Sequence, residues 1–128
     1  MFLHDWEDSG FNGMLAAFHA NDIEPDSAEI ATIAANDEWK DVEVLLASYT
    51  HEEYEGAAFV LFRRGQKLYE VVANHCSCYG LEGMWAPEET SSDALNHRLV
   101  EGRLGLSERG CNVFAGELRG VLNKITEE

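Results

Sequence analysis

We expect the chain to be organised around the segment Asn74-His75-Cys76-Ser77-Cys78-Tyr79-Gly80-Leu81-Glu82. It comes directly after a strand-like run of residues and places two of the three cysteines directly after a histidine. Thiolate and imidazole groups are the ligands that zinc prefers in proteins. The sequence therefore predicts a zinc-binding turn, with His75, Cys76 and Cys78 as ligands, that connects the sheet to the next part of the chain.

The geometry of this segment requires a bend. In a straight strand Cys76 and Cys78 share one face and His75 points away, so the three meet one ion only if the backbone turns. A disulfide between the two cysteines would close a small, strained ring. Because there is no second cysteine pair, the fourth ligand stays open among Cys111, His97, His51, Glu82 and water. The alternative is two buried thiols beside a hydrogen-bonded histidine.

The apolar pattern of the residues that precede this segment predicts three antiparallel strands. Residues 67–73 lead directly into the cysteine segment, and residues 57–62 form a continuous apolar run typical of a central strand. Val42, Val44 and Leu46 mark the remaining strand by their alternation. A polar, acidic turn at 50–56 and a short turn at 64–66 would connect the three strands into a meander.

Helices are predicted on both sides of these strands. Residues 11–18 have helical apolar spacing, and a second helix starts at Pro25-Asp26-Ser27 and ends before residue 36. A third runs through Leu95 and Leu99, and residues 114–125 form an amphipathic terminal helix. We therefore expect one α+β domain, residues 1–128: a small three-stranded antiparallel sheet packed with helices and stabilised by a metal site.

The chain is strongly acidic, with 24 acidic and 9 basic residues and a net charge of −15. Residues 1–60 carry 14 acids and one base, whereas residues 61–128 carry 10 acids and 8 bases. Such a field repels nucleic acid and favours basic proteins as partners. The alternative interpretation is an acidic surface that only keeps the protein in solution.

Some of these acids have a local structural reason, because carboxylates are favourable at the start of a helix. Others do not, and we predict that they form a partner-binding surface that either imitates nucleic acid or is attracted to a basic groove. Single strands place carboxylates too far apart to match the charge density of duplex DNA, so several elements would have to contribute. The predicted surface consists of Asp37, Glu38, Asp41, Glu43, Glu52, Glu53 and Glu55.

Segments for export or membrane insertion are not expected. No apolar run approaches the roughly 20 residues that span a bilayer, and the first eight residues lack the basic and apolar regions of a signal peptide. An odd number of cysteines without an export signal favours a reduced, cytoplasmic protein.

Known catalytic motifs are not found in the chain. A zinc deaminase would need His-x-Glu followed by Pro-Cys-x-x-Cys, and the His-Glu-x-x-His pattern of zinc hydrolases and glycine-rich phosphate loops are also missing. A cysteine nucleophile would need a base oriented toward it, and neighbours such as His75 and Cys76 seldom face each other. We therefore expect the protein not to be an enzyme.

Residues 54–90 resemble a family of small phage and prophage proteins. The likeness rests on Tyr54–Phe62, Lys67–Val71, the His-Cys-Ser-Cys-Tyr-Gly-Leu-Glu segment at 75–82, and Trp85–Thr90. A small, acidic, phage-type protein with a metal site is also similar to zinc-containing anti-CRISPR inhibitors of Cas9. The similarity to the anti-CRISPR inhibitors lies in size, charge and the metal site, and no individual residues are matched. It implies a protein that acts in the cytoplasm of a bacterial host by occupying a nucleic-acid-binding surface.

Together these observations predict an acidic inhibitor that binds a CRISPR effector nuclease such as Cas9 and blocks DNA loading, with zinc holding its fold. Direct binding of nucleic acid or of a membrane is not expected. One alternative is a small metal- or thiol-dependent enzyme that uses Cys76 or Cys78. Another is a phage accessory protein without a nuclease partner.

Overall fold

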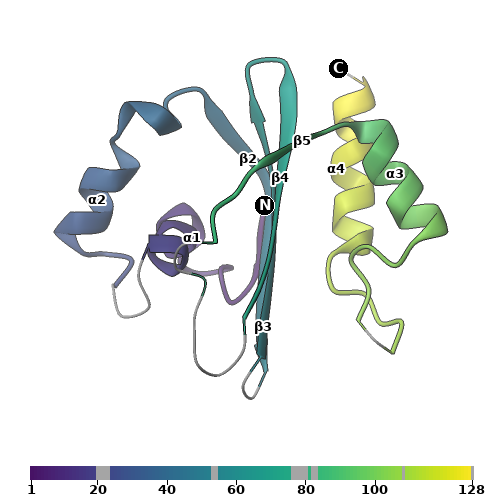
Figure 1. Cartoon of the computed structure of the whole chain (residues 1–128), viewed down its shortest axis with the longest axis horizontal. Coiled ribbons are helices and arrows are strands. Elements are labelled where there is room, and N and C mark those ends of the chain that lie inside the picture. Colours follow the sequence, from purple (N-terminus) through teal and green to yellow (C-terminus); the bar gives the residue numbers. More distant parts are fainter. Residues whose placement is uncertain (20–23, 53–54, 76–80, 82–83, 108, 128) are drawn as a thin grey trace.

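The structure, a computed structural model, describes residues 1–19, 24–52, 55–75, 81, 84–107 and 109–127. One sheet separates two layers of helices, with α1 and α2 over one face and α3 and α4 over the other (Figure 1). The elements are β1 (Phe2–His4), α1 (Gly10–His19), α2 (Ala28–Ala34), the 3₁₀ helix η1 (Asp37–Trp39), β2 (Val42–Glu52), β3 (Glu55–Arg64), β4 (Lys67–His75), β5 (Glu88–Thr90), α3 (Ser92–Glu101) and α4 (Ala115–Glu127).

The sheet is mixed and has five strands, in the order β1-β2-β3-β4-β5. β1 runs parallel to β2, with Phe2 opposite Ala47, and all other neighbouring strands are antiparallel. Parallel neighbours cannot be joined by a tight turn and need a long crossover. The chain makes this crossover through α1, α2 and η1, so these helices lie together on one face (Figure 1).

The predicted three-stranded antiparallel sheet is therefore wrong, although its three strands are the central ones of the sheet. The missed strands β1 and β5 have three residues each, too few to show the alternation that predicts a strand. The predicted turn at 50–56 is also shorter than expected, because pairing of β2 with β3 continues to Glu52 and Glu55.

The predicted fold class also included a stabilising metal site, and the part of the chain that the structure describes does not contain one. Those residues contain no group of three or more His, Cys, Asp or Glu side chains that could hold a metal ion. The described fold is held by packing on both faces of its sheet. Cys76 and Cys78 lie outside the described residues.

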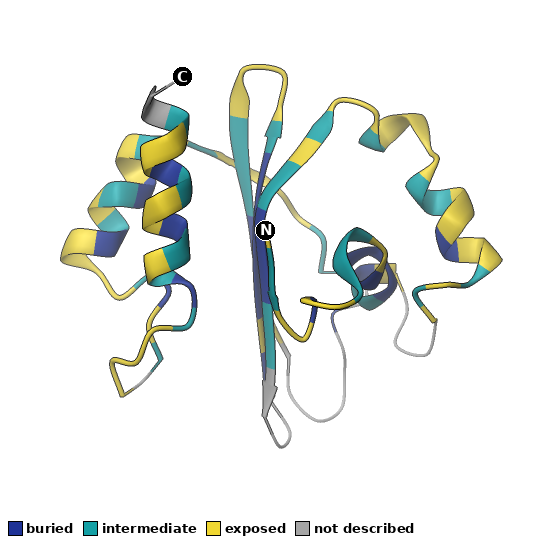
Figure 2. Cartoon of the chain, turned by 180° about the vertical axis from the view of Figure 1, so that it is seen from behind, coloured by how far each residue is buried: buried dark blue, intermediate teal, exposed yellow. Residues whose placement is uncertain are grey.

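The core is built around β3, which is buried on both faces. Val60 and Phe62 pack against the α1–α2 layer, and Phe59 and Leu61 pack against the α3–α4 layer. A strand that is covered on both sides must be apolar at successive positions. The run at 57–62 therefore indicated a central strand correctly, and buried positions also line the inner sides of the helices (Figure 2).

The predicted helices are confirmed with small differences at their ends. Met14 in α1 is fully buried, as are Leu118 and Leu122 in α4, which agrees with the predicted apolar faces. The Ser91 hydroxyl accepts a hydrogen bond from the Ala94 amide at 3.1 Å and caps α3. No helix in the described part of the chain is long and apolar enough to cross a bilayer.

The α3–α4 layer is attached to the sheet by polar contacts as well as by packing. Nη1 of Arg98 in α3 lies 2.6 and 2.7 Å from the two carboxylate oxygens of Glu70 in β4. At the other side of the layer, Nε2 of His4 lies 2.7 Å from the carbonyl oxygen of Val113. These contacts fix α3 to β4, and the loop before α4 to β1.

Gly105 organises the loop between α3 and α4. Its carbonyl oxygen accepts hydrogen bonds from the amides of Val113, Phe114 and Ala115 at 2.8, 3.0 and 3.2 Å. Its φ is +81°, and a Cβ atom added there would lie 2.5 Å from the Ala115 nitrogen. The loop therefore requires glycine at this position, both for its conformation and for the close approach of the start of α4.

We predict that Gly105→Ala lowers the free energy of unfolding by about 2–5 kcal/mol, because left-handed strain adds to a backbone collision. Gly65→Ala is the matched control, since Gly65 has a φ of +64° but nothing within 4 Å of an added Cβ. The control should lose only about 1–2 kcal/mol. Urea denaturation followed by circular dichroism measures both, and equal losses in the two variants would contradict this account of the loop.

Candidate functional site

The acidic residues nearest to η1 form an exposed group at one end of the sheet. Asn36 caps η1, and its Oδ1 accepts a hydrogen bond from the Glu38 amide at 3.0 Å. Asp37, Glu38 and Asp41 are exposed, and their carboxylates make no ion pair with any described residue. We refer to these three residues as the η1 acidic group.

An aromatic anchor holds this group against the core. Trp39 is the next residue after Glu38, and its ring centroid lies 5.4 Å from that of Phe11 and 5.3 Å from that of Trp85. Trp85 in turn stacks on the buried Phe62 at 5.6 Å. The Trp39 indole nitrogen is buried and has no hydrogen-bond partner among the described residues. Aromatic packing therefore fixes the backbone of η1, which carries the acidic group, before any partner binds.

Glu43, which the sequence grouped with these acids, lies on the other face of the sheet. Its neighbours Val42 and Val44 pack against the α1–α2 core, and successive side chains of a strand alternate between faces. The Glu43 carboxylate lies 2.8 Å from Nη2 of Arg63, its cross-strand partner in β3. Its charge is thus neutralised within the molecule.

Glu52 and Glu55, which were also predicted to bind a partner, lie at the far end of β2. This strand is 11 residues long, so at about 3.3 Å per residue its two ends are roughly 33 Å apart. Glu52 and Glu55 form the last residue pair of the β2–β3 hairpin. Their side chains and the whole of Glu53 lie outside the described residues. The members of the predicted set that the structure describes are therefore divided between the two ends of β2.

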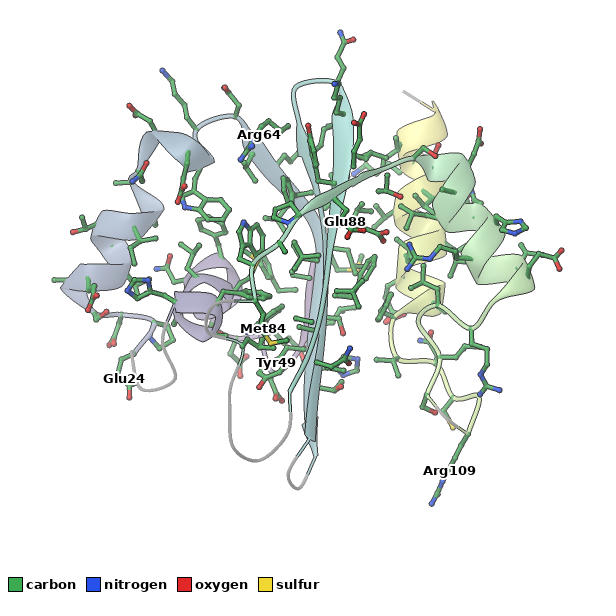
Figure 3. The ribbon with its side chains drawn as sticks, in the orientation of Figure 1. Glu24, Tyr49, Arg64, Met84, Glu88 and Arg109 are labelled. Atoms are coloured by element: carbon green, nitrogen blue, oxygen red, sulfur yellow. The ribbon has the colours of Figure 1, made fainter. Side chains whose placement is uncertain are left out.

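The predicted surface left out further exposed acids of the N-terminal part, including Glu24 and Asp26, which the sequence interpretation assigned to the start of a helix. One group lies in the turn between β1 and α1, and a second lies just before α2, where Glu24 projects away from the sheet (Figure 3). The sequence did contain a signal for these acids: they are numerous, and Lys40 is the only lysine or arginine within residues 1–60 that could pair with them. These additional exposed acids are Asp5, Glu7, Asp8, Glu24 and Asp26.

The opposite layer has a different charge balance. Glu70 is paired with Arg98, and the Glu117 carboxylate accepts a hydrogen bond from the Asn112 amide at 2.9 Å. Exposed basic residues also occur there, including Arg109, which projects from the loop between α3 and α4 (Figure 3). The excess of negative charge therefore belongs to the N-terminal half and its helical layer.

The predicted metal ligands cannot be assembled from the described residues. The side chain of His75, at the end of β4, and all of Cys76 and Cys78 lie outside them, as do Glu82 and the His51 side chain. The other two candidates for the fourth ligand, His97 in α3 and Cys111 in the α3–α4 loop, are exposed. The zinc site stays a prediction from the sequence, and so does the thiol enzyme that would use the same cysteines.

We predict that purified protein contains about one zinc ion per chain, because thiolate and imidazole groups are the ligands that zinc prefers in proteins. Cys76→Ser combined with Cys78→Ser should reduce zinc to background. Cys111→Ser is measured beside it, because Cys111 in the α3–α4 loop is one of the candidates for the fourth ligand: retained zinc excludes Cys111 from the site, and lost zinc assigns it there. Elemental analysis after gel filtration measures all three proteins, and wild-type protein without zinc would contradict the prediction.

Comparisons of the chain with protein families, with curated proteins and with solved structures gave no match. Any proposal for its function is therefore built on this chain's own residues. The η1 acidic group and the Trp39 anchor supply the geometry from which that proposal starts.

Proposed function

We propose that the protein is a non-catalytic inhibitor whose acidic N-terminal half binds a basic nucleic-acid-binding surface of a CRISPR effector nuclease such as Cas9. Occupation of that surface would block DNA loading in the cytoplasm of the bacterial host. Two kinds of observation support this function. The charge distribution favours a cationic protein partner, and the resemblance to phage-type proteins and to zinc-containing inhibitors narrows the class of that partner.

One observation carries the proposal: most exposed carboxylates without an ion-pair partner among the described residues belong to residues 1–41. Eight exposed acids between residues 1 and 41 have no ion-pair partner among the described residues: Asp5, Glu7, Asp8, Glu24, Asp26, Asp37, Glu38 and Asp41. Carboxylates that already have a cationic neighbour gain little from a second one. Free carboxylates instead increase the rate of encounter with a basic surface and select against anionic ones.

The rigid support of the η1 acidic group also favours a binding role. Ordering flexible side chains and loops at an interface costs about 0.5–1.5 kcal/mol for each immobilised side chain. A short helix fixed to the core by Trp39 avoids the backbone part of this cost. Binding through such a group needs no catalytic residue.

We predict that Asp37→Asn combined with Asp41→Asn weakens binding to guide-loaded Cas9 by about tenfold at 0.15 M salt, because two attractions to the basic partner surface are removed while the side-chain shapes are kept. The affinity of this variant should also depend less steeply on salt. Biolayer interferometry over a series of salt concentrations measures both effects.

The matched control is Glu43→Gln, which removes one carboxylate of the same chain segment that is already paired with Arg63. Glu43→Gln should change the affinity for Cas9 less than about twofold, because the Glu43 carboxylate already has a cationic partner within the molecule. Equal losses in the control and in the Asp37 and Asp41 variant would contradict the proposed surface. Absence of wild-type binding at low salt would contradict the proposed partner.

A further inference from the structure

Arg64 is a cation that the protein itself places beside the η1 acidic group. It is the last residue of β3 and lies on the same face as Phe62, two positions earlier, because strand side chains alternate. Its Nη2 donates a hydrogen bond to the Glu38 carbonyl at 3.2 Å. Its guanidinium carbon lies 5.8 Å from the centre of the Phe62 ring, on the α1–α2 side of the sheet (Figure 3).

The surroundings of this guanidinium have the chemistry that recognises arginine. A main-chain carbonyl accepts a hydrogen bond from it, and an aromatic ring lies below it. That ring belongs to a stacked series, since Phe62 lies 5.4 Å from Tyr69 and 5.6 Å from Trp85 at interplanar angles of 17° and 16°. A planar guanidinium suits such a combination of acceptor and ring better than an ammonium group does.

The contact is also easily exchanged. Arg64 is exposed and makes no ion pair with any described residue, and exposed contacts of a charged side chain contribute little net stability. An incoming cation in the same position would meet the same carbonyl and ring, next to the negatively charged η1 acidic group. Arg64 therefore occupies a favourable position for a cation without being held there strongly.

We propose that Arg64 fills a cation subsite formed by the Glu38 carbonyl, the Phe62 ring and the η1 acidic group, and that an arginine of the partner replaces it in the complex. Arg64 then acts as an internal competitor that lowers affinity and selects partners rich in arginine over those rich in lysine. The inference rests on the proposed function only in requiring a cationic partner. It deepens that function by naming the side chain that is recognised.

The test compares Arg64→Ala with Lys40→Ala, because both remove one positive charge near the η1 acidic group. Binding of nona-arginine and nona-lysine peptides is measured by isothermal titration calorimetry. Arg64→Ala should bind nona-arginine about fivefold more tightly than Lys40→Ala does, as expected for one cation–aromatic contact. The two variants should bind nona-lysine equally. Equal affinities for nona-arginine, or weaker binding by Arg64→Ala, would overturn the proposal.

Arg64→Lys provides a second variant that keeps the net charge and serves if Arg64→Ala does not fold. A lysine is the poorer occupant of the subsite, so this variant should bind nona-arginine more tightly than wild type, and unchanged affinity would count against the subsite. The peptides report on the subsite without the nuclease. Failure of the proposed function, seen as no binding to Cas9, is therefore distinguishable from failure of this inference.

Discussion

Burial of β3 on both faces is the constraint on which the rest of the structure depends. Phe59 and Leu61 face one helical layer, and Val60 and Phe62 face the other, so neither layer can be removed without exposing a large part of the core. At about 25 cal/mol for each Å² of apolar surface, each buried side chain of this size contributes roughly 1.5–3 kcal/mol. Two separate apolar clusters, joined only through the sheet, result from this arrangement.

The two layers also separate the charges of the molecule. The crossover from β1 to β2 carries α1, α2 and η1 to one face, and with them most of the acids of residues 1–60. The chain returns to the opposite face only after β5, and there acids such as Glu70 and Glu117 have polar partners. Topology therefore converts an imbalance along the sequence into an acidic N-terminal layer, which is the physical basis of the proposed binding role.

The parts of the fold that could be predicted are determined by residues close in sequence, and the parts that could not are determined by contacts between residues distant in sequence. The central strands and the terminal helix could be predicted because their signals are local: the apolar run at 57–62 and the helical spacing of Leu118 and Leu122. The position of β1 could not, since Phe2 pairs with Ala47 across two intervening helices. β5 was missed for a related reason, because its three residues pair with β4 through the backbone and carry no periodic pattern.

The candidate site was predicted in part. Asp37, Glu38 and Asp41 are exposed as expected, but Glu43 points to the opposite face, and strict alternation from Val42 and Val44 would have indicated this. The pairing of Glu43 with Arg63 depends on the register between β2 and β3, which the pattern of one strand alone does not give. The part played by Trp39 as the anchor of η1 depends on contacts with Phe11 and Trp85, distant in sequence, and no local pattern indicates it.

The most direct test of the central claim is hydrogen–deuterium exchange of the chain alone and saturated with guide-loaded Cas9. We predict slower exchange in the complex for amides of α2, η1 and the start of β2, with little change in α3 and α4. Protection confined to α3 and α4, or no protection at saturating Cas9, would contradict the claim that the acidic N-terminal layer binds the partner.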